Sequence, residues 1–240
     1  MKYYLHREIL QQLRLPLLCL LIGIPWLIYG KVGFANCTFL LVGISFSFLT
    51  LRKLWQHRHT QKYYKHFTER PAILEGSSIL FPDGYYFECS ELHVSRRLEA
   101  HNIEECCINT WPISFVTKDR EVVFVANIEK NDIEKFCEAA AIPIAARIDI
   151  WERINWPFLD TDFDEEEVIK NEEILAAAGI QQQELKAIRK EISAVMSAND
   201  LVWEWLYLGQ FDYLSWTRLT KEKYWWSMEI ALRNFKGESA

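Results

Sequence analysis

Residues 113–125, ISFVTKDREVVFV, contain two β-rich runs with four polar residues between them. Ile113–Thr117 and Val122–Val125 are dominated by β-branched and aromatic side chains, which favour β-strands. The charged residues 118–121 match the length of a hairpin connection. The stretch therefore predicts two adjacent antiparallel strands, and with them the β part of the fold.

Further short β-rich pieces precede this hairpin, and turn residues such as Gly76 and Gly84 divide them. After Ala126 the period becomes helical, and this helix ends before Pro143. Residues 71–145 are therefore predicted to form an antiparallel β domain of about seven strands with one helix after them. The other predicted strands cover residues 73–74, 79–81, 85–87, 92–94 and 103–108.

Residues 146–240 follow a helical pattern and are acidic and rich in tryptophan. An acidic first turn after Asp162 or Asp164 and a stop at Gly179 predict one helix over residues 165–178. Further helices are predicted over residues 181–197, 200–208, 211–219 and 224–235. Because the connections are short, we expect a compact helical bundle of antiparallel neighbours.

The N-terminal 70 residues differ from the rest in charge and hydropathy. They carry ten Lys or Arg against two acids, a net charge of +8; since the whole chain has −6, residues 71–240 carry −14. They also hold two uncharged apolar runs, residues 15–29 and 32–51. About 20 apolar residues span a bilayer core. The fold class expected is therefore an α+β membrane protein with a two-helix transmembrane hairpin within residues 1–70.

The distribution of Lys and Arg around the two runs predicts the orientation of the hairpin. Cations precede the first run and follow the second, whereas Lys31 alone lies between them. The positive-inside rule then places both termini in the cytoplasm. A cleaved signal peptide is the alternative for the first run, but a second apolar run follows at once.

The order of these parts resembles a known family. A two-span hairpin followed by about seven short strands and one helix is similar to bacterial membrane proteins with a YcxB-like, pleckstrin-homology-like (PH-like) domain. The resemblance implies a small barrel or sandwich closed by a helix, located at the bacterial inner membrane. It also implies a scaffold that recognises lipids, peptides or proteins and rarely catalyses, although fold alone does not assign a ligand.

Five tryptophans within 24 residues, from Trp203 to Trp226, are the strongest candidate for a binding surface. Tryptophan and tyrosine are enriched where protein interfaces carry binding energy. Packing inside the bundle is the alternative. The residues predicted to contact a protein partner are Trp203, Trp205, Tyr207, Asp212 and Trp216.

Basic residues between 52 and 70 are candidates for contact with membrane lipids, because cations there are attracted to anionic headgroups. The alternative is a basic flank that only stops membrane transfer. The residues concerned are Arg52, Lys53, Lys62 and Lys65.

The spacing of Asp160, Asp162 and Asp164 matches the first ligand positions of a calcium-binding EF-hand loop. However, the sixth position of that loop requires glycine and is Glu165 here, and the twelfth requires glutamate and is Asn171. An EF-hand is therefore excluded. These carboxylates fit either a hydrolytic metal site or, more simply, the cap of the following helix. No cofactor is expected, because the sequence has no phosphate loop, dinucleotide fingerprint or kinase signature.

The acidic part of the chain would repel phosphates, so a nucleic-acid partner is not expected. The leading hypothesis is a non-enzymatic, inner-membrane-anchored binding or regulatory protein whose cytoplasmic region captures another protein. An immunity-type factor that holds a cationic partner is one form of it. The alternatives are a membrane-tethered metal-dependent hydrolase and a sensor of anionic lipids.

Overall fold

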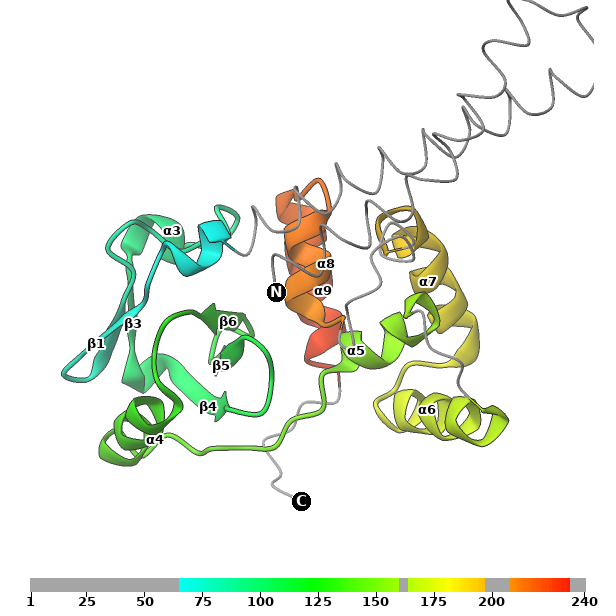
Figure 1. The fold of residues 1–240 in the computed structure, drawn as a ribbon, viewed down its shortest axis with the longest axis horizontal. Helices are drawn as coiled ribbons and strands as arrows, with labels where there is room; N and C mark the ends of the chain where they lie inside the picture. The colour runs from blue at the N-terminus through cyan, green and yellow to red at the C-terminus, as the bar shows by residue number, and fades with distance from the viewer. Residues whose placement is uncertain (1–64, 160–163, 197–207, 234–240) are drawn as a thin grey trace, which may run out of the picture. The chain divides into compact units, whose positions relative to one another are not determined.

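The architecture comes from a computed structural model, which describes residues 65–159, 164–196 and 208–233 (Figure 1). The chain divides into two compact units, Met1–Gln61 and Lys62–Ala240, and every described residue belongs to the second. Its fold is α+β, with two small antiparallel sheets and several helices.

The first sheet has three strands in the order β1 (Ile73–Glu75), β2 (Ser78–Leu80) and β3 (Arg97–Glu99). A two-residue turn joins β1 to β2, and Gly76 takes the left-handed conformation there, with φ of 57°. Ile79 pairs with Leu98 and is fully buried, so one face of the sheet joins the core.

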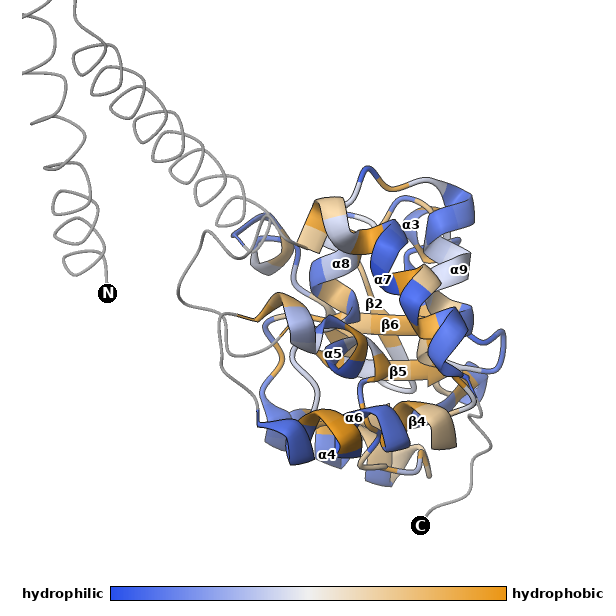
Figure 2. Ribbon diagram, turned by 90° about the vertical axis from the view of Figure 1, so that its right-hand side faces the viewer, coloured by the Kyte–Doolittle hydropathy of each residue, from blue (hydrophilic) through white to orange (hydrophobic). Residues whose placement is uncertain are grey.

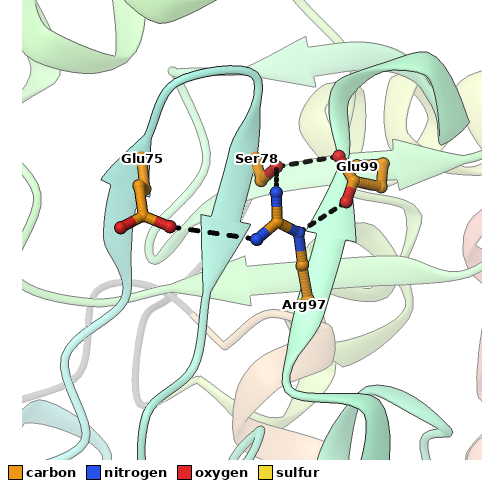
Figure 3. A network of polar contacts seen from close by, with 4 residues as sticks. All are labelled: Glu75, Ser78, Arg97 and Glu99. Carbon is orange, nitrogen blue, oxygen red and sulfur yellow. Dashed lines mark hydrogen bonds and ion pairs between the residues drawn. The ribbon is translucent and has the colours of Figure 1, made fainter.

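A polar network crosses the other face of this sheet (Figure 3). The Arg97 guanidinium donates to the Ser78 hydroxyl at 2.7 Å and to the Glu99 carboxylate at 2.5 Å, and lies 3.8 Å from Glu75. Hydrogen bonds from Ser78, and then from Arg97, lower the pKa of Glu99. The network ties all three short strands together through one side chain.

The second sheet has the order β4 (Ile103–Cys107), β5 (Ile113–Thr117) and β6 (Val122–Val125). Ile113 pairs with Val125 and Val116 with Val122, which confirms the predicted hairpin. All four residues of β6 are buried. All four are also apolar, so apolar and polar residues do not alternate along this strand.

Helix α4 (Lys130–Ala139) follows the second sheet and ends before Pro143, as the helical period predicts. A loop then runs beside β4: Cys106 N–H donates to Pro143 O at 2.8 Å, and Ala145 N–H donates to Cys106 O at 2.9 Å. Arg147 of this loop lies 3.4 Å from the Glu105 carboxylate, and both side chains are almost buried. The loop thus covers the edge of β4.

The remaining helices are α5 (Ile150–Asn155), α6 (Glu165–Ala177), α7 (Gln182–Met196), α8 (Gln210–Trp216) and α9 (Lys221–Ala231). Helix α5 contacts each of the other four. The fully buried Trp151 stacks on Tyr213, with ring centroids 4.5 Å apart, and donates its indole N–H to Ser227 O at 3.0 Å. One short helix therefore organises the packing of the others.

The sheets and the last two helices share a hydrophobic core. The Phe211 ring of α8 lies 4.5 Å from the Phe67 ring and 5.5 Å from the Phe124 ring of β6, between centroids. Figure 2 shows β5 and β6 as hydrophobic strands behind the helices. The β region and the C-terminal helices thus bury their apolar side chains together within the second unit.

The α+β part of the expected fold class is confirmed, but the expected β domain of about seven strands followed by one helix is wrong. Among the described residues, six strands in two sheets of three take the place of the seven predicted strands. Of the other expected strands, residues 85–87 lie in a loop and residues 92–94 in the one-turn helix α3 (Leu92–Ser95). The Ser90 hydroxyl accepts the Leu92 N–H at 3.1 Å, which favours a helical turn over a strand there.

The two spans of the expected transmembrane hairpin fall on residues that the structure does not describe. Within residues 65–159, 164–196 and 208–233, no helix combines the length and the apolar character needed to cross a membrane. The two apolar runs, residues 15–29 and 32–51, lie outside the described residues.

Candidate functional site

Two of the five residues predicted to contact a partner lie in the described part of the chain, both in α8. Asp212 is 1% exposed, and its carboxylate accepts a hydrogen bond from the Gly209 N–H at 2.9 Å. Trp216 is half-buried and packs against the core. Asp212 therefore acts as a cap inside the fold, closed to a partner. Trp203, Trp205 and Tyr207 lie outside the described residues.

Lys65 is the one predicted lipid-contact residue that the structure describes. It is helical and forms an exposed ion pair with Glu69 at 3.4 Å. Exposed pairs of this kind contribute little to stability. Arg52, Lys53 and Lys62 lie outside the described residues.

Asp164, from the predicted acidic metal site, caps α6. Its carboxylate accepts the Glu167 N–H at 2.8 Å, and the Glu167 carboxylate accepts the Asp164 N–H at 3.2 Å. This reciprocal capping box confirms the capping interpretation for this residue. Asp160 and Asp162 lie outside the described residues, and the described ones form no cluster of three or more metal-binding side chains.

Helix α6 presents an acidic face with apolar residues among the acids. It carries five glutamates against one lysine, and only Asn171 and Leu175 are buried. Val168 is 43% exposed and Ile169 53% exposed. Figure 2 shows hydrophilic and hydrophobic segments alternating along this helix. Such a surface combines the long-range attraction of charge with apolar area that a partner can bury.

A groove lies beside this face, between α6 and the start of α7. Its volume is about 270 Å³, and it is open to solvent. Ile180 and Leu185, which are almost fully buried, contribute apolar side chains to it, and Glu172 and Glu173 bring carboxylates. The other lining residues are Ile169, Ala176, Gln181 and Gln182.

Local capping sets the geometry of this groove. Gly179 follows α6 with φ of 85°, so the chain turns sharply. Gly179 N–H donates to Ala176 O, and Ile180 N–H donates to Leu175 O, both at 2.9 Å. This Schellman motif directs Ile180 back against the end of α6. The predicted stop at Gly179 is therefore confirmed, and it makes one wall of the groove.

Nearby cations moderate the charge around the groove. Burial lowers the pKa of Arg189, whereas the neighbouring Glu172 raises it. Arg233 pairs with Glu184 of α7 at 2.8 Å. Glu173 and the three glutamates of the first turn keep α6 acidic overall.

A second polar cluster is buried between the β5–β6 turn and α9. Glu121 is 6% exposed and accepts a hydrogen bond from the Tyr224 hydroxyl. Burial raises the pKa of Glu121, while hydrogen bonds from Ser90 and Tyr224 lower it. Burial also raises the pKa of Tyr85, whose hydroxyl oxygen accepts the Phe124 N–H at 2.9 Å. This cluster can hold a proton inside the fold.

The groove was not predicted from the sequence, although the sequence contains a signal for it. A helix that packs along one stripe has apolar residues three and four positions apart. In α6 the apolar residues Val168 and Ile169 are adjacent, so they cannot share one narrow stripe. Such an excess of apolar residues on an acidic helix indicates a second contact surface.

No protein-family model, curated protein or solved structure matches the chain. The resemblance to YcxB-like, PH-like membrane proteins therefore stays a prediction.

Proposed function

We propose that the chain is a non-enzymatic binding protein that recognises a cationic protein partner through the acidic face of α6. One observation carries the proposal: α6 has five glutamates against one lysine and leaves Val168 and Ile169 about half exposed. The glutamates speed encounter with a basic surface, and the apolar residues contribute burial once contact is made.

The test neutralises charge on α6 without disturbing its cap. Glu167 is kept because its carboxylate takes part in the capping box. The variant changes four other glutamates of the helix to glutamine: Glu165, Glu166, Glu172 and Glu173. A matched control neutralises four exposed glutamates on other elements: Glu88, Glu104, Glu129 and Glu138. The two variants have the same net charge.

Each tagged full-length protein is used to capture partners from its own cells at low and at high salt. We expect a basic protein to copurify with the wild type and the control, and to be lost from the α6 variant. It should also be lost near 1 M salt, where the screening length falls to about 3 Å. The proposal fails if no captured protein distinguishes the α6 variant from its control.

A further inference from the structure

We infer that the groove between α6 and α7 holds a large aliphatic side chain from an amphipathic, cationic helix of the partner. The inference rests on the proposed function and adds the form of the partner segment. That segment would carry one apolar stripe with Lys or Arg on either side of it.

The size of the groove favours a side chain over a small-molecule ligand. Its volume of about 270 Å³ is below the roughly 300–1,000 Å³ of sites that enclose drug-sized ligands. It is also open on one side, so a ligand would not be enclosed. One or two aliphatic side chains from a larger partner fit such a space, while the rest of the partner lies over the rim.

The residues that line the groove favour a partner segment in which an aliphatic side chain lies close to a lysine or arginine. Ile169, Glu172, Glu173 and Ala176 lie three and four positions apart, so they share one face of α6. This face offers a hydrophobic contact at each end and carboxylates in the middle. A partner helix that crosses it with leucine at the groove and lysine one turn away would pair with both features.

Charge argues against the other occupants. A second copy of this chain using the same face would bring two acidic helices together, and like charges repel. Nucleic acid and anionic lipid carry phosphates, which the same glutamates repel. A cationic protein helix is the occupant for which the charges and the apolar lining act in the same direction.

The probe is a synthetic peptide of about sixteen residues, made of leucine and lysine, with leucines at helical spacing on one face. A second peptide has the same composition in an order that breaks the stripe, and a third replaces lysine with glutamate. Binding to the immobilised full-length chain is measured by a titration. We expect the striped cationic peptide to bind best and the acidic peptide not to bind.

Two matched substitutions test the groove itself. Ala176→Phe fills it, whereas Ala177→Phe makes the same change at an exposed neighbour that does not line it. Filling the groove should lower the affinity for the striped peptide at least about tenfold, because a buried aliphatic contact is lost. Ala177→Phe should change the affinity less than about twofold. Thermal unfolding of both variants checks that the helix is retained.

The outcomes separate this inference from the proposed function. If neutralising the four α6 glutamates weakens binding of the striped peptide and Ala176→Phe does not, the peptide is recognised by charge alone. That result overturns the groove inference. If the shuffled cationic peptide binds as well as the striped one, the inference is also overturned. If the chain dimerises and Ala176→Phe abolishes the dimer, the occupant is a second copy, which overturns a partner helix.

Discussion

The Tyr224 hydroxyl of α9 donates a hydrogen bond to the buried carboxylate of Glu121, which ends the turn between β5 and β6. The two residues are 103 positions apart in the chain. Tyr85 and Ser90, from the loops between β2 and β3, interact with the same pair. Three distant segments thus meet at one carboxyl group inside the core.

Removing the Tyr224 hydroxyl tests how much this contact stabilises the fold. Tyr224→Phe keeps the ring but leaves a buried carboxylate with one donor fewer, so the free energy of unfolding should fall by about 1–3 kcal/mol. Denaturant titration measures the loss. In the Glu121→Gln background the same change should cost less, and equal costs in both backgrounds would contradict a direct coupling.

The raised pKa of Glu121 predicts a pH dependence. Because the folded state holds this proton more tightly than the unfolded state, the contribution of Glu121 to stability is fully present below the ordinary glutamate pKa of 4.5 and is lost as the pH rises through the folded value. Glu121→Gln removes this contribution. Unfolding measured from pH 4 upward should show a shallower decline for the variant than for the wild type, and parallel curves would refute the prediction.

Two helix ends offer a matched test of backbone conformation. Ala141 follows α4 with φ of 53°, and Gly179 follows α6 with φ of 85°. Ile142 N–H donates to Cys137 O at 2.8 Å, so both ends form the same motif. Ala141→Gly should stabilise the protein by about 1 kcal/mol, and Gly179→Ala should destabilise it by a similar amount, in thermal unfolding. Changes of the same sign would contradict this explanation.

The buried pair of Glu105 and Arg147 predicts a different response. Burial raises the pKa of Glu105, and Arg147 opposes the rise. Arg147→Met should lower the free energy of unfolding by about 3 kcal/mol at pH 8, because the Glu105 carboxylate loses its counter-charge. The loss should be smaller at pH 5. Denaturant titration measures both values. Adding Glu105→Gln should recover part of the loss.

The control for that experiment is an exposed ion pair of the same kind. Lys135 and Asp132 lie 3.5 Å apart on α4, and both side chains are largely exposed. Water screens this pair, so Lys135→Met should leave the unfolding transition nearly unchanged. If both substitutions cost the same, burial is not what makes the Arg147 contact important.

Local signals account for the elements that could be predicted from the sequence. The hairpin of β5 and β6 follows from two β-branched runs and a polar turn, and α7 follows from its apolar period. Helix α6 follows from an acidic first turn and Gly179. Helix α9 starts earlier than expected because the Thr220 hydroxyl accepts the Lys223 N–H at 3.3 Å.

Other elements have weak local signals and depend on distant contacts. Helix α5 is short, and its cap at Asp149 and the burial of Trp151 between other helices hold it in place. Strand β3 is three residues long, and its pairing with β2 and the Arg97 network stabilise it. No pattern within either segment is long enough to predict it.

The sequence by itself determined the charge division of the chain, the central hairpin and the helices that begin and end at strong caps. Each depends on residues close together in the chain, whose conformational preferences act over a few bonds. Only the tertiary structure decided that Asp212 is buried, that Glu121 meets Tyr224, and that α6 and α7 leave an apolar groove beside acidic side chains. Those features arise where distant segments exclude water together, and no local pattern specifies which segments will meet.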